Sequence, residues 1–131
     1  MRHKITKIDT GRARLNKKEA SIRINKSGLS ADGQQRYVVA IRFTEDGQKK
    51  ASSNGYVAME TDDELNRLYS MTAKQSDGYK LSASGKNAKS KSITFAVRHI
   101  EDWKAILGDY DMKKDAKDGT YYIDLKMCPR V

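Results

Sequence analysis

Apolar and polar residues alternate along several short stretches of the chain, and this pattern predicts β-strands. The clearest stretches are Ser21–Asn25 and Ala40–Thr44, the second being the end of a longer stretch that begins at Tyr37. A period of two places successive side chains on opposite faces of a sheet. Between them, Lys26–Gly33 contains two Gly and three Ser or Asp residues, which favour a turn. We therefore expect a β-hairpin in the first half of the chain.

The same reasoning predicts further short strands. They are expected at Tyr56–Glu60, from Tyr79 onward, at Ile93–Val97 and at Thr120–Leu125. In the intervening segments, residues 45–47 are expected to form a turn, and residues 49–55 a polar loop.

Helical spacing is found in one segment. Ile100, Trp103, Ile106 and Leu107 lie three or four residues apart, which predicts an amphipathic helix over about 99–108 that ends near Gly108. A second helix start is suggested by Thr61, with Glu64 three residues later. The residues after Glu64 fit either a short helix or a strand, and the pattern does not decide between them.

These elements predict an α+β fold. We expect a curved, mostly antiparallel β-sheet of about six strands, with the one amphipathic helix (about 99–108) packed on it. The length of 131 residues fits one domain. Residues 1–18 are interpreted as a basic N-terminal arm or strand, and residues 19–131 as a single α+β domain.

The net charge of the chain is +9, and it is unevenly distributed. Residues 1–50 carry 13 basic and 5 acidic side chains, whereas residues 78–98 carry five basic side chains and no acidic one. Such a distribution predicts one basic face, which would attract a polyanion or an acidic partner.

Two short segments concentrate this charge. Gly85–Ser92 holds three lysines among small polar residues that allow close approach to a phosphate, and Gly11–Lys18 is the second basic segment. The candidate phosphate-binding residues of these two segments are Arg12, Arg14, Lys86, Lys89 and Lys91.

The predicted hairpin adds further candidates. Arg23 and Arg42 each lie between two apolar residues, so both are expected on the outer face of the sheet, together with Asn25 and Lys26. Arginine can stack on a base and bind a phosphate. Tyr37 and Tyr79 are candidates for stacking on bases.

Other kinds of chemistry have weaker support. Cys128 is the single cysteine, which excludes an internal disulfide and a multi-thiolate metal site. The acidic clusters lack the spacing of a calcium loop. We predict no catalytic residue, no metal site and no cofactor. No apolar stretch is long enough to span a membrane and none resembles a signal peptide, so a location in the reducing cytoplasm is expected.

One stretch resembles a known family. Lys89–Phe95 followed by Glu101–Leu107 resembles the positive-cofactor and Whirly-like single-stranded DNA-binding proteins, in which a basic loop leads into a strand and then a helix; Trp103 and Leu107 match that helix. The resemblance covers about 20 of the 131 residues. It implies a curved antiparallel sheet, a homodimer and binding of single strands across the sheet. The predicted strand at 120–125 is an addition to the family's pattern.

The function predicted from these observations is non-catalytic binding of nucleic acid. Single-stranded DNA or RNA is favoured, with little sequence specificity, because no helix is basic enough to read a major groove. The alternative is a protein-interaction module, such as an inhibitor from a phage or mobile element, that docks on an acidic or nucleoprotein partner.

Overall fold

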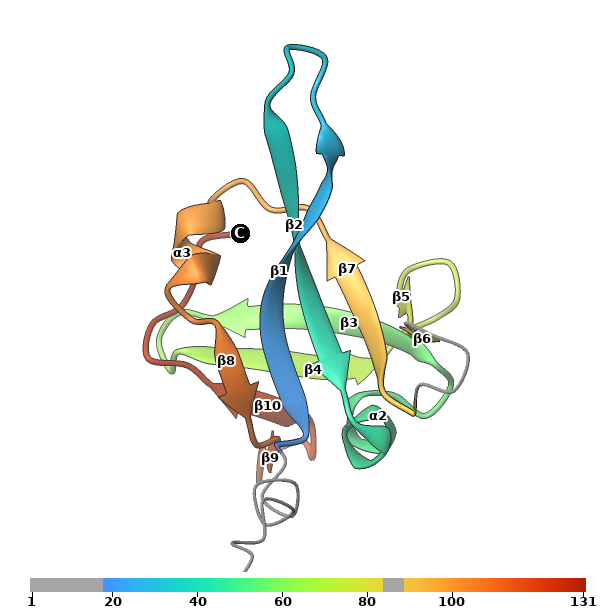
Figure 1. The fold of residues 1–131 in the computed structure, drawn as a ribbon. Helices are drawn as coiled ribbons and strands as arrows, with labels where there is room; N and C mark the ends of the chain where they lie inside the picture. Colours follow the sequence, from blue (N-terminus) through green and yellow to red (C-terminus); the bar gives the residue numbers. More distant parts are fainter. Residues whose placement is uncertain (1–17, 84–88) are drawn as a thin grey trace, which may run out of the picture.

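The computed structural model describes residues 18–83 and 89–131, which form two antiparallel β-sheets and two short helices (Figure 1). The first sheet has the strand order β6-β7-β2-β1-β8 and consists of β1 (Ala20–Leu29), β2 (Gln35–Phe43), β6 (Ser82–Ala83), β7 (Lys91–Phe95) and β8 (Gly108–Tyr110). The second sheet has the order β5-β3-β4-β10-β9 and consists of β3 (Tyr56–Asp62), β4 (Arg67–Thr72), β5 (Tyr79–Lys80), β9 (Lys113–Lys114) and β10 (Tyr121–Asp124). The helices are α2 (Glu45–Ala51) and α3 (Ile100–Lys104).

The α+β class and the antiparallel pairing are confirmed, but the strands form two sheets of five instead of one sheet of about six. The second sheet crosses behind the first in Figure 1. Side chains from both sheets join one buried cluster, to which Ile22 and Phe43 belong from the first sheet and Leu68 and Ile123 from the second. Two sheets facing each other give this chain, with its few large apolar residues, a shared interior.

The β1–β2 hairpin confirms the predicted alternation. Ile22 and Ile41 face each other in the ladder and are fully buried. The strands are longer than expected, because β1 continues to Leu29 and only residues 30–34 form the turn. The outer part of the hairpin projects beyond the two sheets (Figure 1). A bulge between Lys26 and Gly28 interrupts the register there.

Helix α2 replaces the turn predicted for residues 45–47 and the first part of the polar loop predicted for residues 49–55, whereas residues 52–55 form no helix or strand, as expected. The side chain of Thr44 accepts a hydrogen bond from the main-chain N–H of Gly47 at 3.2 Å and caps the helix. Acidic residues occupy its first turn and lysines its last, which complements the helix dipole. A Cβ at Gly47 would lie 2.2 Å from the carbonyl oxygen of Glu19, so a glycine is required where α2 packs against the start of β1.

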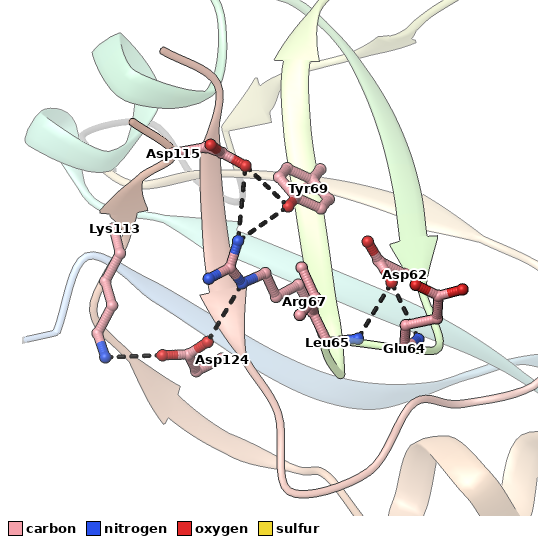
Figure 2. A network of polar contacts seen from close by, with 8 residues as sticks. All are labelled: Asp62, Glu64, Leu65, Arg67, Tyr69, Lys113, Asp115 and Asp124. Carbon is pink, nitrogen blue, oxygen red and sulfur yellow. Dashed lines mark hydrogen bonds and ion pairs between the residues drawn. The ribbon is translucent and has the colours of Figure 1, made fainter. Parts of the chain in front are cut away.

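The helix start suggested at Thr61 is wrong. Strand β3 continues to Asp62, whose carboxylate accepts hydrogen bonds from the main-chain N–H groups of Glu64 and Leu65 at 2.9 and 3.1 Å (Figure 2). Asn66 then adopts a left-handed conformation with φ of 52°, which turns the chain into β4 instead of a helix. The acidic side chain therefore closes a hairpin between β3 and β4.

The predicted helix over 99–108 exists but is shorter. Helix α3 ends at Lys104, and the chain enters β8 at Gly108, where it pairs with Ile22 of β1. Trp103 and Ile106 are buried as expected, whereas Leu107 is 44% exposed and does not share their face. Because pairing with β1 ends the helix early, the helical spacing no longer applies at Leu107. No helix of the described residues is long and apolar enough to cross a membrane.

Candidate nucleic-acid interface

A cleft of about 690 Å³ with a basic lining lies between α2, the edge strand β5 and the start of β7. We refer to it as the basic cleft. Its lining comes from segments far apart in the sequence: Glu45, Gln48, Lys49, Ser52, Asn54, Gly55, Tyr56, Lys80, Leu81 and Lys91.

Hydrogen bonds to the main chain fix the walls of the basic cleft. The side-chain amide of Gln48 donates to the carbonyl oxygen of Lys89 at 2.8 Å and thereby joins α2 to the segment before β7. At the end of α2, the Ser52 hydroxyl donates to the carbonyl oxygen of Tyr56 at 2.6 Å. The main-chain N–H of Leu81 donates to Gly55. Helix α2, β3 and the residues after β5 are thus held together around the cleft.

The charge of the basic cleft is uncompensated. Lys49, Lys80 and Lys91 form no ion pair with any other described residue. Glu45 is the only acidic residue in the lining, so the lining side chains carry a net charge of +2. In contrast, Lys50 of the same helix pairs with Glu19, outside this lining. An anion that entered the cleft would meet three lysines without displacing a carboxylate from them.

Two of the predicted phosphate-binding residues lie at this cleft. Lys91 lines it, and Lys89 is exposed beside it, with its carbonyl oxygen bound by Gln48. Arg42 is exposed and has no ion pair among the described residues. Lys91 pairs with Phe43 in the ladder and shares its face of the first sheet, whereas Arg42, the residue before Phe43, points to the opposite face. Lys89 and Lys91 are therefore brought together with the cleft, whereas Arg42 lies outside it.

The hairpin candidates do not form the single outer cluster that was predicted. Arg23 is exposed on the outer face, but its guanidinium donates to the carboxylate of Asp109 at 2.7 Å and to the carbonyl oxygen of Gly108. Lys26 lies on the opposite face, because it follows Ile24 by two residues and faces Tyr37 in the ladder. The prediction that Lys26 lies beside Arg23 and Arg42 is therefore wrong, because residues an odd number of positions apart in a strand point to opposite faces.

The two tyrosine candidates are both partly exposed but lie apart in the fold. Tyr79, in edge strand β5, is 46% exposed. Tyr37, on the hairpin, is 39% exposed, and the ammonium of Lys104 lies 5.5 Å from the centroid of its ring. Tyr79 precedes Lys80, which lines the basic cleft, but the two side chains lie on opposite faces of β5, so Tyr79 is next to that site in the sequence and outside its lining. Arg12, Arg14 and Lys86 lie outside the described residues.

Lys49 and Lys80 are cleft residues that the sequence pattern does not single out. The pattern predicts a polar loop at Lys49, although acidic residues at 45 and 46 followed by lysines at 49 and 50 are a signal for a short helix. No local signal marks Lys80, because only the packing of β5 against β3 brings it to α2 and β7.

A second polar cluster, drawn in Figure 2, is neutralised internally. Arg67 lies 3.5 Å from the carboxylate of Asp115 and 3.8 Å from that of Asp124, and its guanidinium stacks 3.9 Å from the ring centroid of Tyr122. Hydrogen bonds from the main-chain N–H of Lys117 and then from the Tyr69 hydroxyl hold the pKa of Asp115 below its ordinary value. The Lys113 ammonium donates to Asp124 at 2.7 Å, so two cations balance two carboxylates and the cluster ties β4 to β9 and β10 instead of offering a binding site.

The described residues contain no group of three or more His, Cys, Asp or Glu side chains that could hold a metal ion. In comparisons with known proteins, no family model, no curated protein and no solved structure matches the chain. The interpretation of the site therefore rests on its geometry and charge.

Proposed function

We propose that this protein binds nucleic acid, with a preference for single strands and without catalysing a reaction. The observation that carries the proposal is the basic cleft, where Lys49, Lys80 and Lys91 converge from three elements without ion-pair partners among the described residues. Lysine ammonium groups that converge in a concave site are suited to bind phosphates, which supply most of the sequence-independent affinity for nucleic acids.

Single strands are favoured over duplex by the elements around the cleft. Helix α2 has seven residues with acidic and basic ends, and α3 has five residues, so neither resembles a helix that reads a major groove. Tyr79, exposed and adjacent to Lys80, can stack on an unpaired base.

The test uses two variants with equal loss of charge. In the first, Lys49, Lys80 and Lys91 are changed to Ser. In the control, Lys114, Lys117 and Lys126, which are exposed and lack ion pairs among the described residues, are changed to Ser. Fluorescence polarisation with labelled single- and double-stranded oligonucleotides at two salt concentrations measures binding. We expect the cleft variant to lose most of its affinity and the control to lose little. An equal loss in both variants contradicts a specific role of the cleft.

A protein partner is the second candidate, and the tip of the hairpin favours it. Leu29 is 67% exposed near the end of a hairpin that projects from the sheets (Figure 1), and a partner that covered the tip would bury this apolar side chain. On this alternative, the parent binds oligonucleotides weakly and retains a specific partner from a nuclease-treated lysate. The variant Leu29→Ser would lose that partner. If the cleft variant also lost it, the three cleft lysines would contact an acidic surface of the partner.

A further inference from the structure

A second cavity lies beyond the contact between β5 and β7. It has a volume of about 370 Å³ and is mainly apolar, and its lining includes Met59, Tyr79, Phe95, Arg98 and Trp103. We refer to it as the aromatic pocket. It lies beside the basic cleft but shares none of the cleft's lining residues.

Three aromatic rings form one side of the aromatic pocket. Tyr79 and Phe95 lie 5.6 Å apart between ring centroids with an interplanar angle of 44°, and Phe95 meets Trp103 edge-on at 5.4 Å. Trp103 is buried and Phe95 is half-buried, whereas Tyr79 is nearly half exposed. The buried Trp103 ring fixes the orientation of Phe95, and the exposed ring of Tyr79 offers a surface on which a flat group can stack.

One cationic side chain belongs to the lining of this pocket. Arg98 is the only charged side chain in the lining, is exposed and has no ion pair among the described residues. A guanidinium can stack on a base and can also bind a phosphate. A purely apolar ligand would need neither contact, so Arg98 favours a ligand that carries a base or a phosphate.

Two strands connect the aromatic pocket with the basic cleft. In β5, Tyr79 lines the pocket and the next residue, Lys80, lines the cleft. In β7, Lys91 lines the cleft, and Phe95, four residues later and on the same face, lines the pocket. At about 3.3 Å per residue, this separation is roughly 13 Å. The cleft and the pocket therefore lie on opposite faces of β5, and the separation of roughly 13 Å along β7 is within the reach of a short oligonucleotide.

We infer that the aromatic pocket receives an unpaired base of a single strand whose phosphates lie in the basic cleft. This inference rests on the proposed function and adds the structural reason for a single-strand preference. Every base has a π-face, so stacking on Tyr79 needs no particular sequence. The bases of a duplex are already stacked and paired, and one of them would have to leave the helix to enter the pocket.

The experiment compares two oligonucleotides of equal length, one of thymidines and one in which abasic sites replace the central bases. Both offer the same phosphates, so the ratio of their affinities isolates the contribution of the bases. Loss of one stacked base corresponds to at least about a fivefold loss of affinity. We expect the parent protein to bind the thymidine oligonucleotide at least about fivefold more tightly than the abasic one.

Variants at Tyr79 test whether its ring causes the difference in affinity between the thymidine and abasic oligonucleotides. Tyr79→Phe keeps the ring and is expected to keep the ratio, whereas Tyr79→Leu keeps an apolar side chain without a π-face and is expected to bring the ratio close to one. Tyr79 is exposed in a two-residue edge strand, so both variants should fold, and thermal melting checks this.

The outcomes separate the pocket from the proposed function. If the parent binds both oligonucleotides equally, or if Tyr79→Leu keeps the parent's ratio, the aromatic pocket does not receive a base, although the basic cleft still binds nucleic acid. If the parent binds neither oligonucleotide, the proposed function itself is wrong, and the inference fails with it.

Discussion

The side-chain amide of Gln48 donates a hydrogen bond to the carbonyl oxygen of Lys89 at 2.8 Å, across 41 positions of the chain. The same nitrogen lies 3.3 Å from the carbonyl oxygen of Phe43. Gln48 therefore holds α2 against both β2 and the segment before β7. It positions one wall of the basic cleft relative to another without contributing charge.

Replacing Gln48 by Ala is expected to lower both stability and binding. The loss of these hydrogen bonds should reduce the free energy of unfolding by about 1 kcal/mol. It should also weaken oligonucleotide binding several-fold, because Lys49 and Lys91 are no longer held at a fixed separation. Gln35→Ala is the matched control, since the Gln35 amide also makes two bonds to carbonyl oxygens, but on the hairpin. A similar loss of affinity in both variants would contradict the positioning role.

The salt dependence of binding should match the number of lysines at the cleft. If Lys49, Lys80, Lys89 and Lys91 each contact a phosphate, the slope of log K against log salt is about −3 for single strands, at roughly 0.7 per contact. Each Lys→Ser change should flatten the slope by about 0.7. Titrations at four salt concentrations measure it. Affinity that does not change with salt would exclude phosphate contacts as the source of binding.

Removing the Trp103 ring should destabilise the whole fold. Trp103 is 2% exposed and packs edge-on against Phe95, so Trp103→Ala is expected to reduce the free energy of unfolding by about 3–5 kcal/mol. Leu107→Ala, in the exposed segment after α3, should change it by less than about 0.5 kcal/mol. Urea denaturation gives both values. Equal effects of the two changes would mean that α3 packs differently from the arrangement described.

Acid should weaken the attachment of the C-terminal segment to α3. Hydrogen bonds from the Arg130 side chain, and then from its main-chain N–H, lower the pKa of Asp102 from 3.8 to about 2. Because the pKa is lower in the folded state, this contribution to stability is complete above pH 4 and is lost as the pH falls toward 2. NMR titration of Asp102 should show the low pKa in the parent. In Arg130→Ala it should move back toward 3.8, and an unchanged pKa would show that Arg130 is not its cause.

The sequence predicts those parts of the structure that depend on local pattern. Ile22 and Ile41 alternate with polar residues and are buried as expected, and the spacing of Trp103 and Ile106 places both in the core. Helix α2 was not predicted, because a glycine inside a short polar segment favours a turn. The reason for Gly47 is its approach to the Glu19 carbonyl oxygen, a contact between segments 28 residues apart.

The candidate site was predicted only in part for the same reason. Lys91 could be identified as a lysine of a basic segment and Tyr79 as an aromatic residue at the start of a strand. The cleft itself forms where α2 and β5 meet β7, and no local pattern encodes that meeting. Arg23 shows the opposite case, since its charge suggested a ligand contact but is balanced by Asp109, 86 positions away.

We expect the outer part of the projecting hairpin to lose its hydrogen bonds before the rest of the first sheet does. Strand β8 pairs with β1 only at Ala20–Ile22, and β7 pairs with β2 only at Val39–Phe43. Beyond these residues the two strands have no third neighbour among the described strands, and a two-stranded ribbon is only marginally stable in water. Its amide protons should therefore exchange with solvent long before those of the paired base, by local fraying instead of global unfolding. The β1–β2 ladder, the longest among the described strands, is thus expected to have a well-protected base and an outer half that opens first.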